Sequence, residues 1–137
     1  MTPERLLVWF LRVTAITLLS AALAVVLPHA WMDAVHRWMG LGELPDSPMV
    51  GYLTRSISAL YAAFGACYWH IAGDVRRYLP LLRFSVLVTI GFAIVLVSVD
   101  VACRLPWEWT FVETTFLISW CAAYAWLIGR VRADQIS

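Results

Sequence analysis

The stretch FSVLVTIGFAIVLVSV, residues 84–99, contains no charged residue and sets the fold class. The hydrocarbon core of a bilayer is about 30 Å thick and a helix rises about 1.5 Å per residue, so a span takes roughly 20 apolar residues. With its flanks the stretch reaches that length, over residues 80–103. Because apolar and polar residues do not alternate along it, the stretch predicts a membrane-spanning helix rather than a strand.

Three further apolar segments predict membrane helices at residues 6–27, 48–72 and 109–129. The 137 residues are 62% hydrophobic and 14% charged, whereas about a quarter of an ordinary soluble domain is charged. We therefore predict one all-α integral membrane domain over residues 1–137, built as a bundle of four transmembrane helices. The first segment resembles a signal peptide, but its apolar run exceeds the roughly 7–15 residues of a signal core, so we expect it to be retained.

The connection between the first two predicted spans is long and contains a helical pattern. Apolar side chains recur at helical spacing within residues 30–40, which predicts a short amphipathic helix in the membrane interface. Gly40 and Gly42 are expected to end it, and Asp46 or Ser47 to cap the helix that begins at Pro48. Two interpretations are open: a connector that rests in the interface, or a lid over the outer mouth of the bundle.

The arginines predict the orientation of the four spans. Three arginines lie on or near one predicted side, namely Arg37, Arg55 and Arg104. The other side holds Arg5, Arg12, Arg76, Arg77, Arg83, Arg130 and Arg132. Because basic residues concentrate in cytoplasmic segments, both termini are predicted to be cytoplasmic. We accordingly expect a multi-pass protein of the bacterial inner membrane.

Three charged residues fall inside predicted spans: Arg55, Asp100 and Glu113. All three lie in the outer half of the bilayer in this topology. A charge deep in a membrane helix costs about 2.5–3.5 kcal/mol on insertion scales and usually finds a partner. Since the planar guanidinium group can serve two carboxylates, we expect Arg55 to face the interior and to meet Asp100, Glu113 or both.

Small and hydroxyl residues share the predicted inner face with Arg55. Ser58 lies on its stripe, and Tyr61 lies near enough to line the interior. The hypothetical ligand-binding cluster therefore comprises Arg55, Ser58, Tyr61, Asp100 and Glu113. Three interpretations are open: an ion-pair network that fixes helix register, an outward polar pocket for a small or lipid-like ligand, or a protonation-coupled carboxylate of a transporter.

Several site classes find no support in the sequence. The net charge is +1, which gives no electrostatic reason to expect a nucleic-acid partner. No metal-ligand spacing, phosphate-binding loop, dinucleotide motif or nucleophile–base set is present. We therefore predict no cofactor, no metal and no catalytic residue. The expected partners are the lipid bilayer, a small hydrophobic or lipid-like ligand, and a homo-oligomer or larger membrane complex.

The layout resembles the DoxX-like superfamily of small bacterial four-helix membrane proteins. The resemblance rests on the proline ending the first span, RSISALYAAFG at 55–65, DVACRLP at 100–106 and Glu113 opening the last span. It implies a four-helix bundle; a few members resemble subunits of oxidoreductase complexes, and distant relatives include sterol-isomerase-like bundles with buried acids.

The combined sequence evidence favours a non-enzymatic binding or accessory subunit with an outward polar pocket. Two alternatives use Asp100 and Glu113. One is a small proton-coupled transporter, and the other is a lipid-active, isomerase-like enzyme in which the two carboxyl groups act as acid and base.

Overall fold

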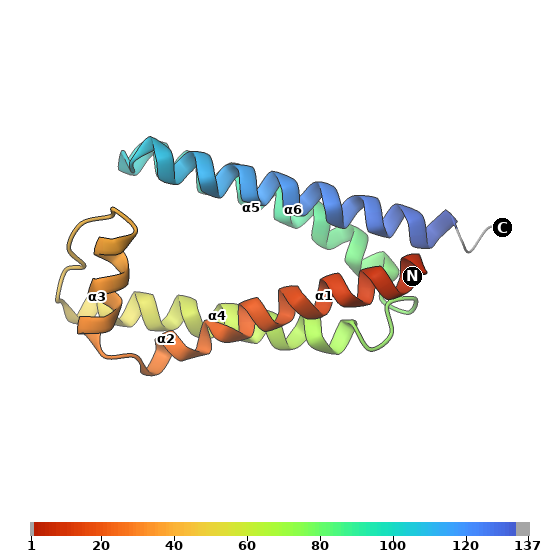
Figure 1. Ribbon diagram of the computed structural model, residues 1–137, viewed down its shortest axis with the longest axis horizontal. Coiled ribbons are helices and arrows are strands. Elements are labelled where there is room, and N and C mark those ends of the chain that lie inside the picture. Colours follow the sequence, from red (N-terminus) through yellow and green to blue (C-terminus); the bar gives the residue numbers. More distant parts are fainter. Residues whose placement is uncertain (1, 134–137) are drawn as a thin grey trace. The chain divides into compact units, whose positions relative to one another are not determined.

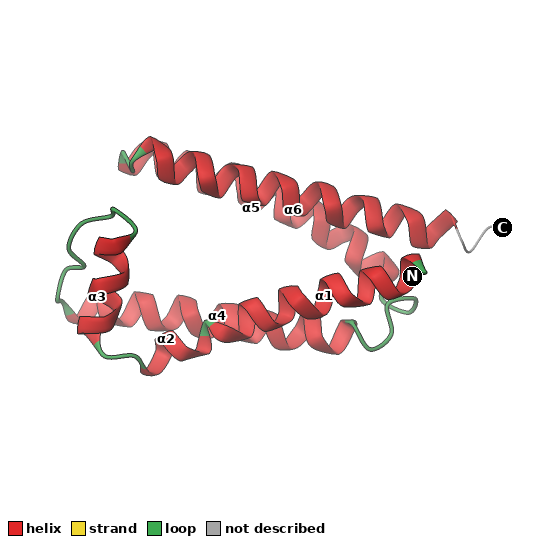
Figure 2. Cartoon of the chain, in the orientation of Figure 1, coloured by secondary structure: helices red, strands yellow, loops and turns green. Residues whose placement is uncertain are grey.

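The computed structural model describes residues 2–133, with side chains to residue 131 (Figure 1). All regular structure in that range is α-helical (Figure 2), which confirms the all-α prediction. The segments are α1 (Pro3–Ser20), α2 (Ala22–Val26), α3 (His29–Trp38), α4 (Pro48–Ile71), α5 (Leu79–Cys103) and α6 (Trp107–Ala133). The side chain of Arg132, counted above among the inner arginines, lies outside the described side chains, as do residues 1 and 134–137.

Five helices result when α1 and α2, which only Ala21 separates, are counted together. The count within residues 2–133 exceeds the four predicted spans by one because the predicted interfacial segment is also helical, as α3. Gly40 and Gly42 follow α3 with φ angles of 76° and 82°. These values belong to the left-handed region that glycine adopts without steric cost, which agrees with their predicted role in ending the helix.

Three of these helices are long and apolar enough to cross a membrane: Pro3–Val26, Leu79–Cys103 and Trp107–Val131. The second has the highest mean hydropathy, 2.5, and contains the stretch 84–99. The predicted span at 48–72 forms α4, a helix of 24 residues, but α4 is not among the three. Arg55 lies within it, and an arginine lowers the mean hydropathy of a segment strongly. Composition therefore supports three spans.

Residues 11–71 form one of two compact units, and a glycine sets the approach of its long helices. A Cβ atom built on Gly65 of α4 lies 2.7 Å from the backbone nitrogen of Leu19 and 2.9 Å from the carbonyl oxygen of Ala15. No larger residue fits that space without a shift. The small residue thus lets α4 pack directly on the backbone of α1, as small residues do between membrane helices.

Residues 2–10 and 72–133 belong to the second unit, in which α5 pairs with α6. Its aromatic centre is Tyr124, which is fully buried and stacks on Phe10 at 5.7 Å between ring centroids. Its hydroxyl group shares a 3.0 Å hydrogen bond with Ser85. The other buried apolar side chains of this unit are Leu7, Ala72, Val75, Leu79, Leu82, Leu127, Ile128 and Val131.

An ion pair joins the chain's first helix to the α4–α5 connection within this second unit. Arg76 donates to Oε2 of Glu4 through Nε at 3.0 Å and through Nη2 at 2.6 Å. In the same connection, the backbone N–H of Arg77 donates to the carboxylate of Asp74 at 3.1 Å. The connection is therefore ordered by side chains rather than by buried apolar contacts alone.

Candidate functional site

Arg55 is half-buried and donates its hydrogen bonds to backbone carbonyl groups. Its Nε donates to the carbonyl oxygen of Val25 at 3.1 Å, and its Nη2 donates to that of Leu27 at 3.4 Å. Its Nη1 donates to the carbonyl oxygen of Gly51, one turn earlier in α4, at 3.4 Å. The guanidinium group is therefore fixed by two segments of the chain, the end of α2 and the first turns of α4.

Pro28 explains why carbonyl groups are open to Arg55 at the end of α2. The last four carbonyls of a helix have no partner inside it, and a proline cannot continue the helix because it lacks an N–H. Leu27 accordingly turns to an extended backbone, with ψ at 136°. A cation near a helix C-terminus is also favoured by the helix dipole. Arg55 thus supplies hydrogen bonds and charge at the place where the chain leaves its first long helix.

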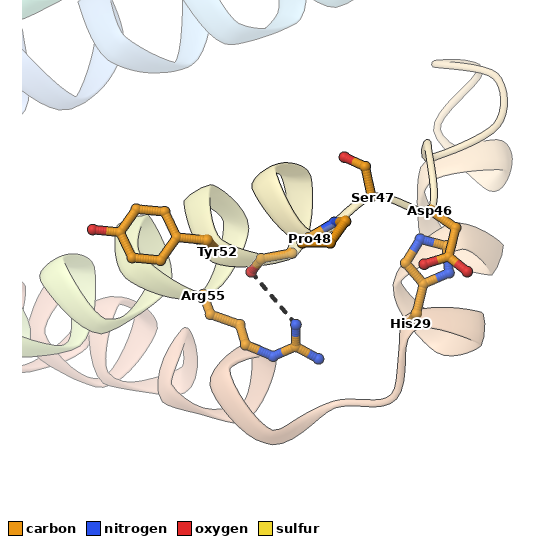
Figure 3. A pocket seen from close by; sticks show the side chains of 7 residues that line it. His29, Asp46, Ser47, Pro48, Tyr52 and Arg55 are labelled. Atoms are coloured by element: carbon orange, nitrogen blue, oxygen red, sulfur yellow. Dashed lines mark hydrogen bonds between the residues drawn. The ribbon is translucent and has the colours of Figure 1, made fainter.

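A pocket of about 480 Å³ lies beside this arginine (Figure 3). Three of its lining residues come from different elements: Arg55 from α4, His29 from the start of α3, and Asp46 from the loop before α4 (Figure 3). The full lining consists of His29, Asp46, Ser47, Pro48, Gly51, Tyr52 and Arg55. The pocket therefore combines a guanidinium group, an imidazole, a carboxylate and hydroxyl groups within residues 11–71.

The first turn of α4 forms one wall of this pocket. The side-chain oxygen of Ser47 accepts a hydrogen bond from the backbone N–H of Val50 at 3.2 Å. Ser47 is therefore the N-cap of α4, which agrees with the prediction of a cap at Asp46 or Ser47 followed by Pro48. Because Ser47 performs the capping, the carboxylate of Asp46 has no such structural duty.

His29 and Asp46 contribute polar groups that the described residues leave unused. The Nε2 atom of His29 is buried and has no hydrogen-bond partner in the described part of the chain. Buried polar atoms are nearly always hydrogen-bonded, so an exception needs an explanation. Asp46 is exposed, and no ion pair or hydrogen bond to its side chain appears among residues 2–131.

The loop that carries Asp46 is braced by α3. Asp33 accepts hydrogen bonds from the backbone N–H of Leu44 and from Nε of Arg37, both at 2.8 Å. Arg37 also donates to Glu43 at 2.6 Å. The Leu44 N–H and the adjacent guanidinium group hold the pKa of the Asp33 carboxyl below its ordinary value of 3.8. This network ties Glu43 and Leu44 to α3, so the loop is anchored part-way along its length.

A second cavity of about 480 Å³ adjoins the first, since both are lined by His29 and Asp46. Its remaining lining residues are Asp33, Arg37, Glu43, Leu44 and Pro45. Arg37 is already paired with two carboxylates there, and those contacts raise its pKa. The guanidinium group of the second cavity is thus already paired with carboxylates of the chain. The first cavity is therefore the better candidate for a ligand.

Asp100 and Glu113, both predicted for the ligand cluster, lie together in the α5–α6 unit. The Glu113 carboxyl group is close enough to that of Asp100 for the two to interact electrostatically. Asp100 is only 4% exposed, and its Oδ2 atom has no hydrogen-bond partner among the described residues. Two carboxyl groups are thus placed side by side, one of them deeply buried.

The remaining predicted site residues, Ser58 and Tyr61, do not line the pocket at Arg55. Ser58 is half-buried, and Tyr61 is 40% exposed. The predicted meeting of Arg55 with Asp100 or Glu113 involves residues of two units that are described separately, and it stays a prediction.

Sequence reasoning missed four polar pocket residues: His29, Asp46, Ser47 as a lining residue, and Tyr52. One signal was present. Pro28 ends a long helix and therefore exposes carbonyl groups, and a nearby arginine in the next span is a natural donor for them. Backbone acceptors exist at every residue, however, so the sequence does not single out Val25 and Leu27.

Comparison of the chain with family models, curated proteins and solved structures finds no match. The DoxX-like resemblance accordingly stays a prediction. Within the described residues, no group of three or more His, Cys, Asp or Glu side chains is arranged to hold a metal ion.

Proposed function

We propose that the chain is a non-enzymatic binding or accessory subunit of the bacterial inner membrane that receives a small or lipid-like ligand in the pocket at Arg55. The observation that carries the proposal is the fixed orientation of the Arg55 guanidinium group. Three backbone carbonyls hold its guanidinium group at the pocket wall. A charged donor held in one orientation binds with less loss of freedom than a mobile side chain, and such preorganisation favours affinity.

The proposal includes four membrane spans. These are the three helices that qualify by composition, and α4 in addition. Both termini are then cytoplasmic. Arg55 lies seven residues after Pro48, or roughly 10 Å along a helix that rises about 1.5 Å per residue. Its hydrogen bonds to carbonyls offset part of the cost of placing a charge at that depth. The pocket then opens at the outer membrane interface, where a ligand arrives from the outer water or the outer leaflet.

Aromatic and basic side chains support this orientation. Arg12 lies over the Trp69 ring at 5.1 Å, and Arg130 lies over the Trp126 ring at 5.0 Å. Arginine and tryptophan together are typical of a membrane interface. On α3, Trp31 and Trp38 are 68% and 86% exposed, which suits a helix that lies in the opposite interface.

Reporter fusions test the topology. An alkaline phosphatase domain fused after Gly42 is expected to be active, since it is exported, and one fused after Asp74 is expected to be inactive. The reverse pattern, or equal activity at both positions, contradicts the proposed arrangement of α4.

Native mass spectrometry tests the binding function. The protein is released from nanodiscs of defined phospholipid composition, and bound molecules are counted. We expect a specifically retained ligand whose occupancy falls at least about fivefold in His29→Gln and is unchanged in Glu108→Gln. Glu108 is exposed and lines neither cavity, so it is the control. Equal retention by all three proteins removes the proposed function.

A second candidate function rests on the carboxyl pair of α5 and α6. Asp100 is deeply buried with an unpartnered oxygen beside Glu113, and buried ionisable residues of membrane helices commonly serve proton relays. A small proton-coupled transporter predicts that Asp100→Asn and Glu113→Gln each abolish pH-driven substrate exchange in proteoliposomes. Exchange that persists in both variants excludes this alternative.

A further inference from the structure

We infer that the pocket at Arg55 recognises a zwitterionic group in which a phosphate ester is linked by a short chain to a primary amine. The inference rests on the proposed binding function and specifies its ligand. It follows from three side chains in one cavity: Arg55, His29 and Asp46. The same chemistry occurs in an aminophospholipid headgroup and in its free phosphoamine.

The anionic half of such a ligand matches Arg55 and His29. A guanidinium group has five N–H donors, and the described hydrogen bonds use one each from Nε, Nη1 and Nη2. One donor on each of the two Nη atoms is then left for a ligand. Arginine binds phosphate oxygens in this paired manner. The buried Nε2 of His29 has no partner, and as an N–H it adds a further donor.

The cationic half matches Asp46. Its carboxylate lines the cavity and has no ion-pair partner within residues 2–131. The contrast with Asp33 is direct, because Asp33 is already paired with Arg37. An ammonium group offers three N–H donors to such a carboxylate. The cavity therefore presents positive and negative groups together, which a purely anionic ligand does not use.

The lining also favours a primary amine over a quaternary ammonium. Quaternary ammonium groups have no N–H donor and are held by cages of aromatic rings. This cavity has one aromatic ring from tyrosine, Tyr52, and an imidazole. A carboxylate that accepts hydrogen bonds is more useful to a primary amine. The volume of about 480 Å³ lies within the usual range of about 300–1,000 Å³ for ligand pockets.

Isothermal titration calorimetry on the full chain in a neutral detergent tests the soluble form of this ligand. The probes are phosphoethanolamine, phosphocholine, glycerol 3-phosphate and inorganic phosphate. We expect phosphoethanolamine to bind at least about tenfold more tightly than the other three. Asp46→Asn is expected to remove that preference and to leave phosphate affinity within about twofold. His29→Gln is expected to weaken the binding of phosphoethanolamine and of phosphate alike, and Glu108→Gln, at an exposed residue that lines neither cavity, to change neither.

A lipid arm identifies the source of the group. Nanodiscs of phosphatidylcholine with phosphatidylethanolamine, or with phosphatidylglycerol instead, are compared by native mass spectrometry. Selective retention of phosphatidylethanolamine, lost in Asp46→Asn, assigns the site to a lipid headgroup. Binding of phosphoethanolamine without that retention assigns it to the soluble ester.

Two failures are distinguishable. If glycerol 3-phosphate and phosphatidylglycerol bind as well as their amine counterparts, and His29→Gln weakens them while Asp46→Asn does not, the zwitterion inference is overturned and the binding function stands. If no probe binds, in either arm, in a manner that His29→Gln changes, both are overturned. Neither variant removes a hydrogen bond that the described structure contains, so folding does not obscure the result.

Discussion

Arg55 in residues 11–71 and Asp100 in the α5–α6 unit are both charged residues near an end of a long apolar helix. Their surroundings differ. Arg55 donates to three backbone carbonyls, whereas Oδ2 of Asp100 is buried without a hydrogen-bond partner among the described residues. A helix that ends at a proline leaves carbonyl acceptors, which suit a cation but not a carboxylate. Backbone carbonyls thus satisfy the charge of Arg55, whereas one buried oxygen of Asp100 receives no hydrogen bond from the described residues.

The largest expected effect comes from removal of the arginine. Arg55→Met leaves the carbonyls of Val25 and Leu27 without their donors. A fully buried group left unsatisfied costs about 1–3 kcal/mol. Because these two carbonyl groups are only part-buried, we expect the free energy of unfolding to fall by about 2–4 kcal/mol in total. The loss is measured by denaturant unfolding in detergent micelles.

Arg55→Lys is the control for that loss, because lysine keeps the charge but cannot reproduce the planar set of donors. It is expected to recover only part of the stability. If Arg55→Met is as stable as the wild type, the carbonyl contacts do not stabilise the protein and the contrast with Asp100 fails.

The next effect concerns the helix crossing that belongs to the same unit as Arg55. Gly65→Val places side-chain atoms where a Cβ is already 2.7 Å from the Leu19 backbone. Overpacking of this kind costs about 1–3 kcal/mol, and we expect a matching fall in unfolding free energy. Gly91→Val in α5, which meets nothing within 4 Å, is the matched control and is expected to change stability by less than about 1 kcal/mol. Equal effects at the two glycines contradict the close approach of α1 and α4.

A smaller effect tests whether the two compared charges interact, as the sequence predicts. A double-mutant cycle combines Arg55→Met with Asp100→Asn. Because all described hydrogen bonds of Arg55 go to backbone carbonyls, we expect additive losses, with a coupling below about 0.5 kcal/mol. A coupling above about 1 kcal/mol brings the two side chains together and replaces the contrast with an ion pair.

The smallest effect is a pH dependence at Asp33, a carboxylate whose partners lie in its own unit. Its pKa is lowered in the folded chain by the Leu44 N–H and by Arg37, from an ordinary value of 3.8. A lowered folded pKa means that the stabilisation is present above pH 3.8 and is lost as the pH falls through the lower folded value. We expect hydrogen exchange at the Leu44 amide to accelerate across that range relative to the Arg77 amide, which donates to Asp74. Asp33→Asn should abolish the pH dependence, and an unchanged profile in that variant contradicts the assignment.

Local features were largely predictable from the sequence, because neighbouring residues determine them. Ser47 caps α4, and Gly40 and Gly42 follow α3 with positive φ angles, as turn and cap preferences indicate. The helical segments lie where the apolar pattern places them. The clearest departure concerns α4, whose hydropathy places it outside the three helices that qualify as spans by composition.

The pocket was not predictable in the same way. His29, Asp46 and Tyr52 are separated along the chain and have no shared spacing. They line one cavity with Arg55 because α3 and its loop fold back beside the start of α4, held by Asp33, Arg37 and Leu44. A contact pattern of that kind depends on side chains that come together only after the chain folds.

The sequence by itself determined that the chain is helical and that it has helices long and apolar enough to cross a membrane. Both properties depend on the hydropathy and the backbone hydrogen bonding of single segments. It also marked Arg55 as the residue in greatest need of a partner. Only the tertiary structure decided which groups accept the hydrogen bonds of Arg55. Any carboxylate or carbonyl satisfies a guanidinium group, and only the position of α2 beside α4 selects the carbonyls of Val25 and Leu27.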